Sequence, residues 1–340
     1  MRPRPIRLAL AAGAALSLLL TGCGSAGDTG SATASSGSSD DAAFPVTIEH
    51  AFGEITIEQE PTKVVTWGFG STDAALALGV VPVAIPQQTY GGNSQGVLPW
   101  IADELTKLGA QTPTILPEGD GSTVPFEEIA AAQPDVILAN YSGITAEDYD
   151  LLSQIAPTVA YPGEAWSTPW RDVVTTVGKA LGKEAQAEQL VADTEKTIAD
   201  KAAEHPELQG KTVAAVWDTA GTFYVYKPAD PRVEFLTDLG LTVAPSVEAQ
   251  ADAGDATFYF TVSYEKVPEI TSDILLTYAS SQEEADAFLA QPYAQLMPQV
   301  QSGHVATLVG QAPVAAVSPP TVLSLPWGLD DYVNALSAAA

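Results

Sequence analysis

Hydrophobic residues recur at helical spacing through the middle of the chain, from Trp166 to Glu204. The apolar positions are Trp170, Val173, Val174, Val177 and Leu181, and after a break at Gly182 and Lys183 they continue at Ala187, Leu190, Val191, Thr194 and Ile198. Ser167 and Thr168 can cap a helix, and Pro169 suits its first turn. The second run alone would be about 30 Å long, the diameter of a small domain. The pattern predicts either a helical spine that joins two lobes or a surface helix within one large domain.

Short strand and helix patterns alternate before this segment. The predicted strands are 46–50, 54–58, 63–67, 80–85, 135–139 and 157–161, and the predicted helices are 71–78, 126–133 and 145–155. The first two strands form a hairpin about Gly53. Because strands and helices alternate, this half predicts an α/β lobe.

The same order of patterns returns after the segment. The predicted strands are 211–217, 222–226, 241–244, 273–277 and 304–309, and the predicted helices are 232–239, 264–268, 283–290 and 329–338. A helix, Leu-Gly and a strand occur at 73–84 and again at 233–244. A helix, Pro-Asp or Ser-Asp and a strand occur at 126–139 and again at 264–277.

These two echoes occur in the same order, so they favour the spine over the single domain. We expect an N-terminal α/β lobe over 44–165, a connecting helix over 166–204 and a C-terminal α/β lobe over 205–340. A ligand cleft is expected between the two lobes.

The N-terminus has the composition of a targeting segment. Three arginines and an apolar run over 8–20 lead to Leu20-Thr21-Gly22-Cys23, and the run is too short to span a membrane. The last four residues resemble the lipobox of bacterial lipoproteins. This resemblance implies a signal peptide over 1–22 and a lipid on Cys23, which is the only cysteine. Residues 23–43 have the small polar composition of a flexible tether, so we expect a bacterial protein anchored on the extracytoplasmic face of the membrane.

The charge of the chain excludes some partners. Residues 1–22 contain three arginines and no acid, so the rest carries 11 basic residues against 42 acidic ones, a formal charge of −31. Nucleic acids and anionic lipid surfaces are therefore poor partners. Only Arg171 and Arg232 remain after residue 22, so a strong anion clamp has few candidates.

Catalytic motifs are sparse. Residues 92–96 match the Gly-X-Ser-X-Gly pattern of a nucleophile elbow, but they lie among Gly and Asn without the required strand and helix. The three histidines, His50, His205 and His304, show no spacing typical of a zinc site. No glycine-rich phosphate loop is present. We expect no enzyme activity, although a lipoprotein hydrolase using Ser94 is an alternative.

Several segments together resemble the iron–siderophore-type substrate-binding lipoproteins of ABC importers, a periplasmic-binding-protein-like class with two α/β lobes and a rigid connecting helix. They are Val64-Val65, STDAALALGVVPVAI (71–85), EEIAAAQPDVILANYSGIT (127–145), LLSQIAPTVAY (151–161), RVEFLTDLGL (232–241), SYEKVPEITSDILLTY (263–278) and AAVSPPTVLSLPWGLDDYV (315–333). Together they span nearly the whole chain after the tether.

The resemblance implies roles for particular residues. In this class an acid on each lobe docks the permease dimer, which points to Asp73 and Asp238, with Glu234 as the alternative to Asp238. Aromatic residues and an arginine in loops after strands hold the iron chelate in this class. The candidates are Trp67, Tyr90, Trp100, Tyr141 and Trp166 in the first lobe and Trp217, Tyr226, Arg232 and Tyr278 in the second. Arg171 is expected to lie along the spine.

The resulting hypothesis is a monomeric, membrane-anchored protein that captures a ferric siderophore and delivers it to an ABC permease. It needs no cofactor and binds no metal directly. The scarcity of arginine favours a neutral or cationic hydroxamate chelate over an anionic triscatecholate, with Lys227 as the only other cation expected near the cleft. Haem or cobalamin binding is the alternative within this class. An adhesin or signalling lipoprotein is an alternative outside it.

Overall fold

The computed structural model describes residues 44–117, 123–252, 254 and 256–340. Cys23, the signal peptide and the tether predicted from the sequence lie outside these ranges. Within the described residues, no helix combines the length and apolar character that crossing a membrane requires.

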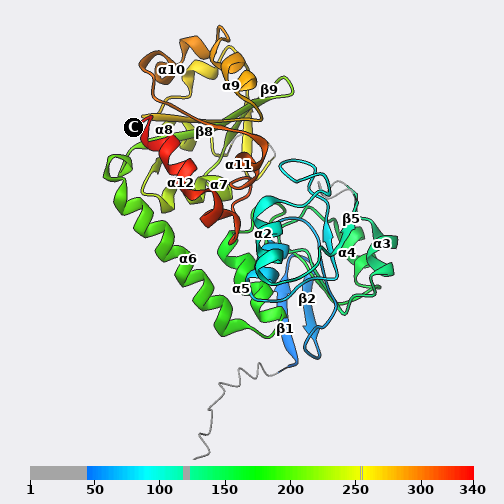
Figure 1. The fold of residues 1–340 in the computed structure, drawn as a ribbon. Helices are drawn as coiled ribbons and strands as arrows, with labels where there is room; N and C mark the ends of the chain where they lie inside the picture. The colour runs from blue at the N-terminus through cyan, green and yellow to red at the C-terminus, as the bar shows by residue number, and fades with distance from the viewer. Residues whose placement is uncertain (1–43, 118–122, 253, 255) are drawn as a thin grey trace, which may run out of the picture. The chain divides into compact units, whose positions relative to one another are not determined.

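Two β-sheets organise the described chain, and each is covered by helices (Figure 1). This confirms the predicted fold class, two α/β lobes joined by a helical segment. The first lobe begins with an antiparallel hairpin of β1 (Val46–His50) and β2 (Gly53–Ile57), as predicted.

The first sheet is five-stranded and parallel, in the order β5-β4-β3-β6-β7. Its strands are β3 (Val64–Thr66), β4 (Ala84–Pro86), β5 (Thr114–Leu116), β6 (Val136–Leu138) and β7 (Thr158–Val159), and the helices between them are α1 (Ser71–Ala77), α2 (Pro99–Lys107), α3 (Phe126–Ala131) and α4 (Ala146–Leu152). Every residue of β3 is buried. A parallel sheet covered on both faces explains why these strands read as continuous apolar runs.

The second sheet has six strands, in the order β11-β9-β8-β12-β13 with β10 beside β8. Its strands are β8 (Thr212–Thr219), β9 (Thr222–Tyr226), β10 (Thr242–Val243), β11 (Tyr259–Val262), β12 (Ile274–Ala279) and β13 (Val305–Val309). The helices are α7 (Pro231–Asp238), α8 (Pro245–Glu248), α9 (Gln282–Leu289), α10 (Pro298–Ser302), α11 (Gln311–Ala315) and α12 (Ser324–Ser337), with short 3₁₀ turns at Pro206–Leu208, Val267–Glu269 and Ala294–Leu296. Strands β8, β10, β12 and β13 are parallel, whereas β9 and β11 add an antiparallel edge.

The sequence echo at 126–139 and 264–277 has the same structural cause in both lobes. Asp135 accepts hydrogen bonds from the backbone N–H groups of Thr62 and Lys63, just before the central strand β3. Asp273 accepts bonds from the N–H and the hydroxyl of Thr212, at the start of the central strand β8. In each lobe the aspartate therefore ties the start of one strand to the start of its neighbour.

The predicted connecting segment consists of two helices, α5 (Trp170–Ala180) and α6 (Glu184–Glu204). Gly182, with φ 67°, lies at the break that the sequence predicts. Helix α5 packs on α1 and β1 of the first lobe, and the 21-residue α6 reaches α7 and α12 of the second (Figure 1). A Cβ at Gly178 would lie 2.2 Å from the Cβ of Ala187, so the glycine allows the two helices to pack closely.

Some local predictions are wrong. Pro169 is the N-cap of α5, and the hydroxyl of Thr168 donates to the carbonyl of Asn140 instead of capping the helix. The predicted helix 264–268 is only the 3₁₀ turn Val267–Glu269, and the predicted strand 80–85 is reduced to β4 at its end. Helix α2 and strands β5 and β11 were not predicted.

Candidate functional site

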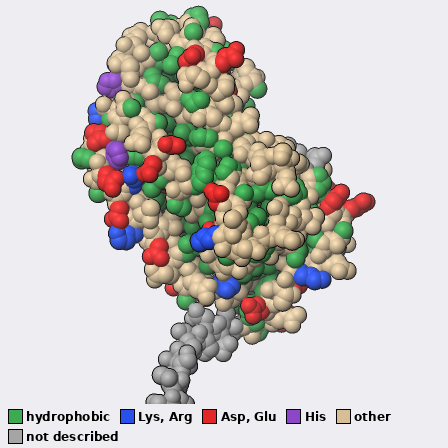
Figure 2. Space-filling view, viewed as in Figure 1, with side chains coloured by type: hydrophobic (Ala, Val, Ile, Leu, Met, Phe, Trp, Pro, Cys, Tyr) green, Lys and Arg blue, Asp and Glu red, His purple; other side chains and the backbone are tan. Residues whose placement is uncertain are grey.

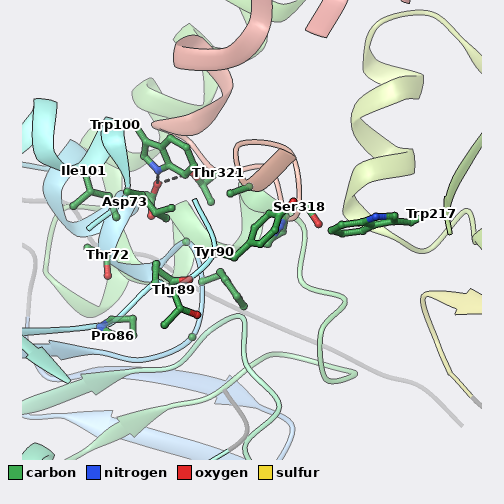
Figure 3. Close-up of a pocket in the computed structure, with 17 residues that line it drawn as sticks. Thr72, Asp73, Pro86, Thr89, Tyr90, Trp100, Ile101, Trp217, Ser318 and Thr321 are labelled. Carbon is green, nitrogen blue, oxygen red and sulfur yellow. Dashed lines mark hydrogen bonds between the residues drawn. The ribbon is translucent and has the colours of Figure 1, made fainter. Parts of the chain in front are cut away.

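A pocket of about 260 Å³ lies where loops of both lobes meet (Figure 3). Its lining residues come from the loops after β3 and β4, from helices α1, α2 and α11, from strand β8 and from the segment before α12. They are Gly68, Phe69, Gly70, Thr72, Asp73, Pro86, Gln88, Thr89, Tyr90, Leu98, Trp100, Ile101, Trp217, Ala315, Ser318, Pro319 and Thr321. The lining is mainly aromatic and aliphatic with interspersed hydroxyl groups, a composition typical of small-molecule sites.

The loop after β3 supplies one wall of the pocket. Gly68 has a φ of 79°, and a Cβ there would lie 2.2 Å from the carbonyl oxygen of Tyr141. The N–H of Phe69 donates to this same carbonyl over 2.9 Å. Glycine at 68 is thus required for the close approach that directs Phe69 to the pocket.

Contacts between the lobes form the opposite side of the pocket. The Tyr90 hydroxyl of the first lobe hydrogen-bonds Ser280 Oγ of the second over 3.1 Å. The rings of Tyr90 and Trp217 lie 6.1 Å apart, and Trp217 lies 5.9 Å from Tyr278. A continuous aromatic contact therefore crosses from one lobe to the other.

Arg232 lies behind this aromatic wall, and its positive charge is compensated by the buried carboxylate of Asp230. Its Nε and Nη2 donate to the two carboxylate oxygens of Asp230 over 2.8 and 2.7 Å, and Nη1 donates to Ser318 Oγ over 2.8 Å. The guanidinium also lies over the ring of Tyr226, 3.7 Å from its centre. Its hydrogen bond to Ser318 connects Arg232 to the pocket lining.

Asp73 is a buried acid in the pocket wall, 2% exposed. Its Oδ1 accepts hydrogen bonds from Trp100 Nε1 over 2.7 Å and from the Thr321 hydroxyl over 2.6 Å (Figure 3). Burial raises the pKa of Asp73 to about 6, although these hydrogen bonds oppose the shift. The carboxylate of Asp73 thus faces the interior and does not reach the outer surface, and the docking role that the resemblance implies for it stays a prediction.

The structure brings only some of the predicted ligand residues to the pocket. Tyr90, Trp100 and Trp217 line it. Tyr141 and Trp166 pack on Phe69, while Tyr226, Arg232 and Tyr278 lie behind the second-lobe wall. Trp67 lies apart from the pocket lining, because its side chain is 0% exposed and packs in the hydrophobic core of the first lobe, so its role in binding stays a prediction without support from this geometry.

Several lining residues were missed in the sequence. Phe69 follows Trp67 by two positions, and the rule that loops after strands line the cleft could have found it. The same rule applies to Thr89, which lies next to Tyr90 in the loop after β4. Ser318 and Thr321 carry no such signal, because their place at the pocket depends on contacts between distant segments.

The other predicted docking acids lie on α7. Arg171 of α5 pairs with Glu195 of α6 over 2.6 Å, and with Glu234 and Asp238 of α7 over 3.1 and 3.0 Å. The side chains of Glu234 and Asp238 are 33% and 21% exposed. Arg171 thus joins three helices, and it lies along the connecting segment as expected.

Acidic side chains are scattered over the face shown in Figure 2, with few basic ones between them. Ser94 lies in a turn where the Asn93 side chain accepts from the N–H groups of Gln95 and Val97, which is not the strand-turn-helix of a nucleophile elbow. Over the described ranges, no three His, Cys, Asp or Glu side chains are grouped so that they could hold a metal ion.

Comparison with known proteins agrees with this architecture. The family model described as periplasmic binding protein matches residues 64–312, so the chain belongs to that family. The resemblance to iron–siderophore substrate-binding proteins of ABC transporters, predicted from the sequence, is confirmed.

The similar proteins bind different iron complexes. The chain is 27% identical over 276 residues to the ferric enterobactin-binding periplasmic protein FepB of Escherichia coli O6:H1, covering 78% of this chain and 84% of FepB. It is 27% identical over 255 residues to the Fe(3+)-citrate-binding protein YfmC of Bacillus subtilis, covering 74% and 75%. The crystal structure of Streptococcus pneumoniae PiaA with ferrichrome superposes with a TM-score of 0.78 at 36% identity, covering 86% of this chain and 98% of PiaA.

We predict that Asp73 makes stability rise as the pH falls from 7 to 5. The pKa of Asp73 is about 6 in the folded protein and 3.8 as the reference for the unfolded chain, so the folded state binds the proton more tightly in this range. The gain from this one group is about 1 kcal/mol between pH 7 and 5. Urea unfolding of the parent and of Asp73→Asn at both pH values measures it. The variant keeps an acceptor oxygen but cannot titrate, so an equal pH response of both proteins would contradict the assignment.

Proposed function

We propose that this protein captures a ferric siderophore of the hydroxamate type and delivers it to an ABC importer, without making or breaking covalent bonds. The observation that carries the proposal is the aromatic pocket between two lobes, together with membership of a family that contains ferric-siderophore binders. Phe69, Tyr90 and Trp217 offer apolar faces for the organic body of a chelate.

The charges around the pocket favour a chelate without negative charge. A trianionic ferric triscatecholate normally requires several unpaired arginines, which bind anions through a planar and permanently charged fork. Of the two arginines in the described chain, Arg232 is engaged by Asp230, and Arg171 by three acids outside the pocket. The similarity to FepB makes a triscatecholate the main competing ligand.

An unused donor supports a ligand with acceptor oxygens. The indole N–H of Trp217 is buried and, within the residues that the structure describes, has no hydrogen-bond partner. Leaving such a group unpaired costs about 1–3 kcal/mol. A hydroxamate oxygen that accepts from Trp217 after a small side-chain movement would recover this cost.

Haem and cobalamin are less well supported ligands. Either would call for an axial ligand such as His or Tyr in the pocket wall. In the part of the chain that the structure describes, no histidine lines the pocket, and its one lining tyrosine, Tyr90, has its hydroxyl hydrogen-bonded to Ser280.

We predict that a ferric trihydroxamate such as ferrichrome quenches tryptophan fluorescence at lower concentration than a ferric triscatecholate. Trp100 and Trp217 line the pocket, so a bound iron chelate lies close to both. Titrations at fixed pH and salt measure the two affinities, and Trp217→Phe should reduce the quenching amplitude. Tighter binding of the catecholate would refute the hydroxamate class, and binding of neither would refute siderophore capture.

We propose that Cys23 carries a lipid that anchors the protein outside the cytoplasm. The support is the sequence of a basic start, a short apolar run and small residues that end at this cysteine. Cys23→Ala is expected to release the protein from the membrane fraction or to block removal of the signal peptide. Membrane fractionation and the mass of the mature chain test this, and a variant that is processed and retained like the parent would contradict it.

We also propose that Glu234 and Asp238 dock the permease. Both are half-buried but reach the surface of α7, and three acids around one Arg171 leave a local excess of negative charge. Neutralising both, as Glu234→Gln with Asp238→Asn, is expected to lower siderophore uptake at least tenfold while the quenching titration is unchanged. The control is Arg171→Gln, which breaks the same ion pairs but leaves both acids charged. If Arg171→Gln lowers uptake as much as the double variant, the acids serve helix packing and not docking.

A further inference from the structure

Two buried carboxylates near the pocket differ in the groups that compensate their negative charge. Asp230 is 0% exposed and forms a double hydrogen bond with the guanidinium of Arg232. Asp73 is 2% exposed, and the side chains that donate to it, Trp100 and Thr321, are neutral. A buried carboxylate without a cation is costly, and such groups concentrate at binding sites.

The surroundings of Asp73 leave this charge uncompensated. Among the residues that the structure describes, the pocket lining contains no lysine, arginine or histidine, and Asp73 is its one acid. The groups that face Asp73 are Trp100 from α2 and Thr321 from the segment before α12, and neither titrates in the range of interest. The pocket wall therefore carries a formal charge of −1 when Asp73 is ionised.

We propose that the pocket receives a cationic arm of the ferric hydroxamate, a primary ammonium group, which Asp73 recognises. This inference rests on the proposed function and specifies its substrate class further. Burial deprives the carboxylate of Asp73 of stabilisation by water, and an ammonium group that enters the pocket would compensate its negative charge. The ring faces of Trp100, Tyr90 and Trp217 would also stabilise a cation. Ligands with the same iron centre but a neutral arm lack both contributions.

A structural role for Asp73 makes a different prediction. Asp73 of the first lobe accepts from Thr321, so it also connects α1 to the segment that precedes α12. Asp73→Asn keeps an acceptor oxygen for Trp100 and Thr321 but removes the charge. Thr321→Val removes the connection but keeps the charge. The two variants therefore separate recognition of a cation from a contact between segments.

The experiment compares ferrioxamine B, which has a free terminal ammonium group, with its N-acetylated form, which is neutral at that end. Both are titrated by tryptophan quenching into the full chain at pH 7.5 and fixed salt, with ferrichrome as a neutral reference. We expect the parent and Thr321→Val to bind the ammonium form about tenfold more tightly than the acetylated form. Asp73→Asn should bind both forms equally.

Asp103→Asn is the matched control, because it removes one exposed acid from α2, one turn beyond Trp100. It should keep the preference, since a general attraction of cations to the acidic surface is screened by salt and barely changed by one charge. Equal binding of the two forms by the parent, a preference that survives in Asp73→Asn, or binding of ferrichrome alone would overturn the inference and leave siderophore capture intact. If none of the three chelates binds, the proposed function itself fails.

Discussion

The pocket depends on parallel strand pairing around β3 and β8, the central strands of the two sheets. Parallel strands end at a common edge, so the loops after β3 and β4 emerge together, as do Trp217 and Ser280 at the ends of β8 and β12. Asp135 and Asp273 tie the opposite ends of these strands to their neighbours. The lining side chains can therefore differ widely in chemistry while the edge that carries them stays in place.

The sequence predicted the parts of the fold that rest on local signals. The hairpin, the alternation of strands and helices, the break at Gly182 and the two echoes all follow from residues near one another in the chain. The echoes are recognisable because the same residues have the same local role in each lobe. Leu-Gly lies at the end of a helix, and an aspartate joins the starts of two neighbouring strands. Helix α2 was missed because its start at Pro99 follows a long loop without a clear period.

The candidate site was predictable only in outline. The aromatic character of the cleft followed from the loops after strands, and Tyr90, Trp100 and Trp217 were found in this way. The position of Asp73 could not be predicted, because its partner Thr321 is 248 residues away in the chain. Its counterpart before the second Leu-Gly, Glu234, remains partly exposed and pairs with Arg171. Asp73 and Glu234 thus have different surroundings, although they occupy equivalent positions in the two echoes, because their partners come from distant parts of the chain.

The contact of one arginine with three helices also restricts how this protein can change over generations. Loss of Arg171 first would leave the carboxylates of Glu195, Glu234 and Asp238 close together without a cation, and their mutual repulsion would weaken the junction of α5, α6 and α7. Loss of Glu195 first removes a charge from an already acidic cluster and is tolerated more easily. Mutational drift at this junction therefore has a preferred order, with Glu195 changing before the arginine.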